Sequence, residues 1–104
     1  MTKMASPSEK TRTMPYSLAE QLRTPEEIAA YLNAWFTEAP DDATSIVRAL
    51  GEITHAKGIE QVARAAGLSR ESLNNSLSEN GNPSFATLLK VARALGVRLH
   101  AEAA

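Results

Sequence analysis

The sequence predicts an all-α fold of about five helices, containing a helix-turn-helix and ending in a short C-terminal β-strand. Apolar residues recur at helical spacing between residues 28 and 95. Ser, Thr and Asp residues stand where these helices would begin, and Gly residues stand where several of them would end. Near the C-terminus the spacing changes to an alternation of period two, which is typical of a strand.

Residues 1–23 are expected to form a flexible N-terminal arm, and residues 24–104 a single helical domain. The first thirteen residues are rich in Ser, Thr, Lys and Pro and hold almost no large apolar side chains, so they cannot build a core. Apolar residues then alternate at Met14, Tyr16 and Leu18, a pattern compatible with a short extended segment.

The first helix is expected to begin after Thr24, which can cap it, with Pro25 at the first helical position and Glu27 completing a capping box. The apolar residues that follow have the spacing of one buried helical face: Ile28, Tyr31, Leu32, Trp35 and Phe36. A second helix is expected from about Ala43 to Gly58. Its inward positions are Ile46, Leu50 and Ile53. His55, near the end of that helix, is interpreted as a partner of the helix dipole.

Two short helices joined by Gly67-Leu68-Ser69 form the predicted helix-turn-helix, at about residues 59–78. Gly67 permits the positive backbone angle that a tight turn requires, and Ser69 can cap the second helix. Leu73 and Leu77 would hold that helix against the core. The outward positions are then the candidate base-reading residues: Arg70, Glu71, Asn74, Asn75 and Ser78.

The outward residue types suit base recognition, because Arg can pair with guanine, Asn with adenine and Glu with cytosine. Helix N-termini and basic side chains would hold the DNA phosphates. The candidates are Lys57, Gln61, Arg64, Ser69, Ser84 and Lys90. The alternative is an ordinary helical hairpin with a solvated polar face.

The last helix is expected between a Ser84 cap and Gly96, with Phe85, Leu88, Leu89, Ala92 and Leu95 on one face. Val97-Arg98-Leu99-His100-Ala101 follows as the predicted strand. A lone strand leaves its backbone unpaired, so it would need the N-terminal arm or a second copy of the chain. Val97, Leu99 and Ala101 are therefore the candidate dimerisation residues.

Composition excludes several classes of site. The chain has no cysteine, which rules out disulfides, thiolate zinc sites and cysteine nucleophiles, and its two histidines make an all-histidine metal site unexpected. No apolar run reaches the ~18 residues of a membrane span. Ser69 and Ser72 have no neighbouring base, and no Gly-rich phosphate loop occurs. We expect a cytoplasmic non-enzyme with no cofactor, metal, membrane partner or small-molecule substrate.

The formal net charge of -1 argues against a polybasic coat but leaves local DNA recognition open. Its distribution is uneven. Residues 1–56 hold five Lys and Arg against eight Asp and Glu, whereas residues 57–104 hold six against four. This division indicates two kinds of surface, although scatter over few charges is the alternative explanation.

Two stretches of the chain resemble known families. Residues 59–96 resemble the phage-repressor (Xre-type) helix-turn-helix domain, including its Gly81-Asn82-Pro83-Ser84 turn. Ala29–Ala101 resembles the small bacterial addiction-module antidote proteins, the HigA-like antitoxins. The matching segments are Ile28–Asn33, Ala49–Ile53, Gly67–Leu73 and Gly81–Thr87.

The resemblance implies a homodimeric antitoxin that binds operator DNA, represses its own operon and neutralises a RelE/ParE-like (HigB-like) toxin. It also implies that the region before the helix-turn-helix, roughly Met14–Ala39, faces the toxin. The candidate toxin-binding residues there are Tyr16, Leu18, Leu22, Tyr31 and Trp35. A stand-alone Xre-type regulator without a toxin partner is the alternative, and a pure protein-interaction module is a third possibility.

Overall fold

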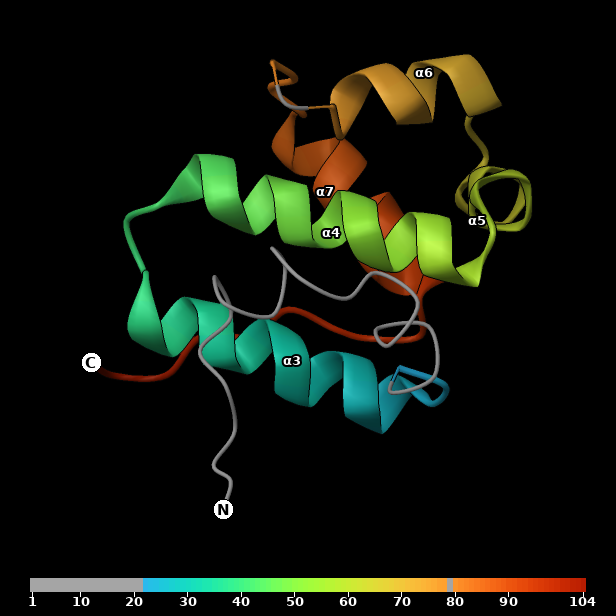
Figure 1. Cartoon of the computed structure of the whole chain (residues 1–104). Helices are drawn as coiled ribbons and strands as arrows, with labels where there is room; N and C mark the ends of the chain where they lie inside the picture. The colour runs from blue at the N-terminus through green and yellow to red at the C-terminus, as the bar shows by residue number, and fades with distance from the viewer. Residues whose placement is uncertain (1–21, 79) are drawn as a thin grey trace.

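Five α-helices make up the part of the chain that the computed structural model describes, residues 22–78 and 80–104 (Figure 1). They are α3 (Pro25–Glu38), α4 (Ala43–Lys57), α5 (Ile59–Ala66), α6 (Arg70–Ser76) and α7 (Phe85–Ala94). Figure 1 shows α3 and α4 side by side. In this view α5 lies beyond the C-terminal end of α4, and α6 lies above α4. The all-α prediction is confirmed for these residues. None of these helices is long and apolar enough to cross a membrane.

Local capping determines where α3 begins. The Thr24 hydroxyl accepts a hydrogen bond from the Glu27 N–H at 3.1 Å, and the Glu27 carboxylate accepts from the N–H groups of Thr24 and Arg23 at 3.1 and 2.8 Å. These bonds, the one from Arg23 foremost, lower the pKa of Glu27. The predicted capping box is present, so the start of α3 follows from chemistry within four residues.

One apolar core joins all five helices. Its members are Leu22, Ile28, Leu32, Leu50, Ile53, Val62, Ala63, Leu73, Leu77, Val91 and Leu95. Leu22 belongs to this core although it falls within the predicted flexible arm. Residues 1–21 of that arm lie outside the described part of the chain.

A close approach of backbones fixes the position of α6 above α4. Gly51 is buried in α4, and a Cβ atom added to it would lie 2.9 Å from the carbonyl oxygen of Leu77. Real Cβ atoms do not approach an oxygen this closely. A glycine at residue 51 therefore lets the end of α6 rest on α4.

The predicted C-terminal strand is not confirmed: residues 97–104 have no regular secondary structure, and no strand occurs in the described ranges. The chain leaves α7 through a Schellman motif. Gly96 has a φ of 84°, its N–H donates to the carbonyl of Arg93, and the Val97 N–H donates to that of Ala92 at 2.9 Å. Val97 then packs against the core, and no described segment offers a strand with which the following residues could pair.

Candidate nucleic-acid interface

A short turn that contains a left-handed glycine joins α5 and α6. Gly67 has φ 72° and ψ 30°, and its N–H donates to the carbonyl of Arg64. The Leu68 N–H donates to the carbonyl of Ala63 at 2.9 Å, and its side chain packs against the core. The predicted role of Gly67 is confirmed, because only a residue that tolerates positive φ forms this turn without strain.

The turn leads directly into a capped α6. The Ser69 hydroxyl accepts from the Ser72 N–H at 3.0 Å, as an N-cap residue does. Leu73 has no exposed surface and Leu77 has 7%, so these two side chains hold the inner face of α6 against the core. The opposite face is left to solvent.

All five predicted base-reading residues are exposed: Arg70, Glu71, Asn74, Asn75 and Ser78. Three of them, Arg70, Glu71 and Asn74, line one open hollow of ≈540 Å³. Ser78 lies beyond the end of α6 and donates a hydrogen bond to the carbonyl of Asn75 at 2.9 Å. These residues are exposed because Leu73 and Leu77 point into the core from the other side of the helix. Their role in DNA binding stays a prediction.

An ion pair joins α5 to α6 at the same surface. Nη1 of Arg70 donates to Oε2 of Glu60 at 3.2 Å, and both side chains remain about two-thirds exposed to solvent. A predicted base-reading cation is thus paired with a carboxylate of the preceding helix.

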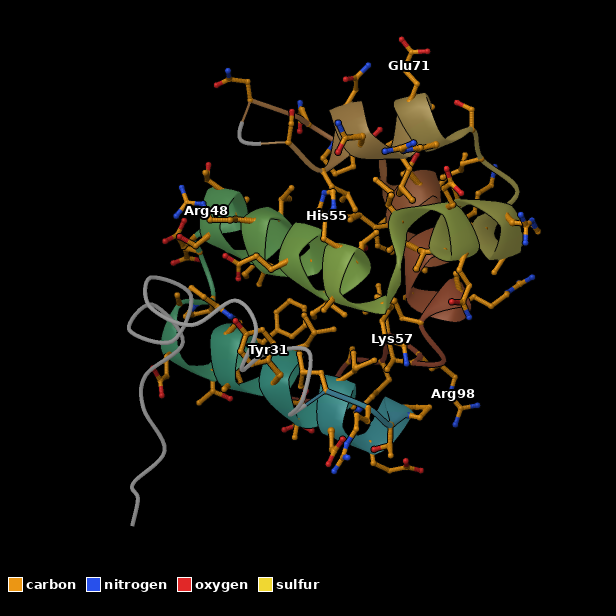
Figure 2. The ribbon with its side chains drawn as sticks, turned by 45° about the vertical axis from the view of Figure 1, so that its right-hand side comes forward. Tyr31, Arg48, His55, Lys57, Glu71 and Arg98 are labelled. Carbon is orange, nitrogen blue, oxygen red and sulfur yellow. The ribbon has the colours of Figure 1, made fainter. Side chains whose placement is uncertain are left out.

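The predicted phosphate-binding residues are spread over several elements. Gln61 and Arg64 are exposed on α5, and Lys90 is exposed on α7. Ser84 caps α7, since its hydroxyl accepts from the Thr87 N–H at 3.1 Å. Lys57 is placed differently: it extends from the end of α4 away from α6, on the side where Arg98 lies (Figure 2).

His55, which the sequence analysis interprets as a partner of the helix dipole, also lies at this surface. It is exposed in the last turn of α4, extends toward α6 (Figure 2), and lines the ≈540 Å³ hollow together with Arg70, Glu71 and Asn74. The spacing of apolar residues shows which side of each helix faces inward. It does not show how the polar faces of two helices meet, so the available signal was only that His55 and Lys57 lie on opposite sides of α4.

The predicted toxin-binding residues divide by burial. Leu22 and Trp35 are each 4% exposed and belong to the interior, whereas Tyr31 is half-buried. Tyr16 and Leu18 lie outside the described residues. Burial is the largest influence on Tyr31 and raises its pKa. The buried atoms Oη of Tyr31, Nε1 of Trp35 and Oε1 of Glu52 have no hydrogen-bond partner among the described residues.

A second exposed feature is an apolar patch formed by Phe36, Phe85 and Leu99. These side chains are 43%, 66% and 38% exposed, although the helical spacing predicts buried positions for Phe36 and Phe85. They come from α3, α7 and the C-terminal segment, and together they border a hollow of ≈300 Å³. Of the predicted dimerisation residues, Val97 packs against the core, while Leu99 and Ala101 line an adjoining hollow.

Comparisons with known proteins assign the family. The family model for "probable addiction module antidote protein" matches residues 12–103. An uncharacterized protein of Haemophilus influenzae is 44% identical over 87 residues, which cover 84% of this chain and 88% of that protein. No solved structure matches the chain. The matched residues span all five described helices and the surface around α6, and on this basis the chain belongs to the family of probable addiction module antidote proteins.

Proposed function

We propose that the protein is the antitoxin of a type II toxin–antitoxin module. In this role it binds and neutralises a RelE/ParE-superfamily (HigB-like) toxin and represses its own operon by sequence-specific DNA binding. The family match supports an antidote role and therefore a toxin partner. The observation that carries the DNA-binding part is the exposed polar face of α6, which follows a capped glycine turn and is held from behind by Leu73 and Leu77.

In this proposal α5, the turn and α6 act as a helix-turn-helix of the phage-repressor type, with α6 in the major groove. Arg70, Glu71 and Asn74 read base edges, because their side-chain types can pair with bases and they lie together around one hollow beside α6. Asn75 and Ser78 give supporting contacts. Phosphates are held by exposed side chains on α5 and α7, including Arg64 and Lys90.

A homodimer follows from the same proposal, because two recognition helices about 34 Å apart read the two halves of a pseudo-palindrome. The apolar patch is the surface we assign to the second copy. A two-fold interface must be self-complementary, and this patch carries a projecting ring, Phe85, beside a hollow of ≈300 Å³. Phe85 of each copy would enter the hollow of the other.

The toxin would contact the half of the chain that precedes α5. Residues 1–56 carry three more acidic than basic side chains, which suits a basic, RNA-handling toxin. Of the predicted contacts on described residues, Tyr31 is the most accessible, since Leu22 and Trp35 are buried. Tyr16 and Leu18 remain predicted contacts in the segment before α3.

Two assays, relief of growth arrest and operator binding, separate the proposed activities. The neighbouring reading frame is expressed alone and with the antitoxin, and operator binding is measured on the upstream promoter. We expect growth arrest that the antitoxin relieves, copurification of the two products, and a specific shift of the promoter. The double variant Arg70→Ala/Asn74→Ala should lose the promoter shift, because both residues lie on α6. It should still relieve growth arrest, because α6 lies outside the half of the chain proposed to contact the toxin.

Each part of the proposal can fail separately. Promoter binding without a toxic neighbour favours a stand-alone regulator. Copurification without a promoter shift leaves a protein-interaction module. A promoter shift that the double variant retains contradicts the assignment of α6 as the reading helix.

A further inference from the structure

We infer that His55 is part of the DNA-binding surface and contacts a backbone phosphate when its imidazole is protonated, so that operator affinity rises as the pH falls. The inference rests on the proposed DNA binding and extends it to α4. The sequence interpretation of His55, a partner of the helix dipole, would give it a role in stability alone.

The position of His55 carries the inference. It is exposed, and it lines the same hollow as Arg70, Glu71 and Asn74, three of the residues assigned to base reading. Its side chain extends toward α6 (Figure 2). A strand of DNA whose bases meet the exposed face of α6 therefore brings its backbone close to the end of α4.

The sequence predicts Lys57 as the phosphate contact at the end of α4, whereas the side chain that extends toward α6 is that of His55 (Figure 2). Two residues along a helix are about 200° apart around its axis, so these two side chains leave α4 on opposite sides. Figure 2 shows Lys57 extending away from α6. At this end of α4, the side chain that can meet DNA beside α6 is a titratable imidazole and not a permanent cation.

The charges around His55 make a phosphate a suitable partner. Arg70 and Glu71 of α6 border the same hollow, although the Glu71 side chain extends away from α4 (Figure 2), and Glu60 of α5 pairs with Arg70 at 3.2 Å. On α4 itself, Lys57 points to the other side. An imidazolium donates hydrogen bonds from both ring nitrogens, and histidine is the side chain that ordinarily changes charge between about pH 5 and 8.

Binding and protonation are then linked. A phosphate that contacts the imidazolium favours the protonated form, so a lower pH must favour the complex by the same free energy. Each phosphate neutralised by a protein cation also releases counterions, which steepens the dependence of affinity on salt by about 0.9 in the log–log slope. A purely structural histidine would not change that slope.

Fluorescence anisotropy with a labelled operator duplex tests the inference, with salt titrations at about pH 6 and about pH 8. For the parent we expect tighter binding at the lower pH and a salt slope steeper by about 0.9 per subunit. His55→Gln should bind with the weaker affinity and shallower slope at both pH values. His55→Lys should keep the steep slope at both, because its charge does not titrate in this range.

His100→Gln is the matched control, since His100 is the other histidine and is exposed in the C-terminal segment. This variant should keep the pH dependence of the parent. If His55→Gln keeps that dependence too, or His55→Lys shows no steep slope at about pH 8, the inference is overturned while DNA binding stands. If the parent binds no operator at either pH, the proposed DNA-binding function fails, and the role of His55 fails with it.

Discussion

Arg70 and Glu60 are joined by an ion pair across the turn between α5 and α6, with 3.2 Å between Nη1 and Oε2. Both side chains remain mostly exposed, and pairs of this kind contribute about 0–1 kcal/mol to folding. Their consequence lies in recognition. The guanidinium proposed to read a base is engaged by the Glu60 carboxylate in this structure, and a base bound there would have to displace that carboxylate.

Glu60→Gln should therefore bind the operator more tightly than the parent, because it frees Arg70 and removes a negative charge near the phosphates. Arg70→Ala should weaken binding by about 1–3 kcal/mol, the value of one good base contact. Both affinities are measured by anisotropy on the operator duplex. Glu26→Gln, an exposed change in the first turn of α3, serves as the control and should leave affinity unchanged. Weaker binding by Glu60→Gln would mean that the carboxylate orients Arg70 productively.

Gly51→Ala tests the close approach of α4 to the end of α6. Alanine in place of glycine inside a helix ordinarily stabilises a protein by about 0.4–1 kcal/mol. Here the new methyl group would lie 2.9 Å from the carbonyl oxygen of Leu77, so we expect the free energy of unfolding to fall by about 1–3 kcal/mol. Urea unfolding measures it, with the exposed Thr44→Ala on the same helix as control. A variant more stable than the parent would show that α6 is not held against Gly51.

The helix boundaries could be predicted because capping is local chemistry. Thr24, Ser69 and Ser84 each accept a hydrogen bond from a backbone N–H three residues later, as their positions in the sequence predict. The C-terminal strand could not be judged in this way. Alternation in five residues records a pattern of side chains, whereas a strand also needs a neighbour, and the described chain supplies none.

The sequence predicts the part of the candidate site that lies on α6. Leu73 and Leu77 define the inner side of α6, so the exposure of Arg70 and Asn74 follows from spacing alone. The neighbourhood of α6 depends on how separate helices pack, and spacing does not encode that. For this reason the sequence does not place His55 beside α6. The spacing also predicts a buried Phe85, whereas the side chain is exposed because α7 begins with this residue at the edge of the core.

Phe85→Asp tests the assignment of the apolar patch to a second copy. The ring is 66% exposed in a single chain, so its loss should change the thermal midpoint of an isolated subunit little. A carboxylate facing the apolar hollow of the partner should instead dissociate the dimer. Light scattering coupled to size exclusion would show the parent at twice the subunit mass and the variant at the subunit mass. Ala30→Asp, exposed on α3 outside the hollow, should remain dimeric. A dimeric Phe85→Asp variant would contradict the assignment.

Glu52→Gln should stabilise the protein at neutral pH. Burial raises the pKa of Glu52, although Arg48 offsets part of this effect, so the folded chain favours the protonated carboxyl. The stabilisation of the parent by this group is complete below the ordinary glutamic acid pKa, and it is lost as the pH rises through the raised value. An amide carries no charge at any of these pH values. The difference in the free energy of unfolding between Glu52→Gln and the parent should therefore be positive at pH ~7 and vanish in acid. Urea unfolding across this pH range measures it. A destabilised Glu52→Gln would show that the ionised carboxylate is favourably held in the fold.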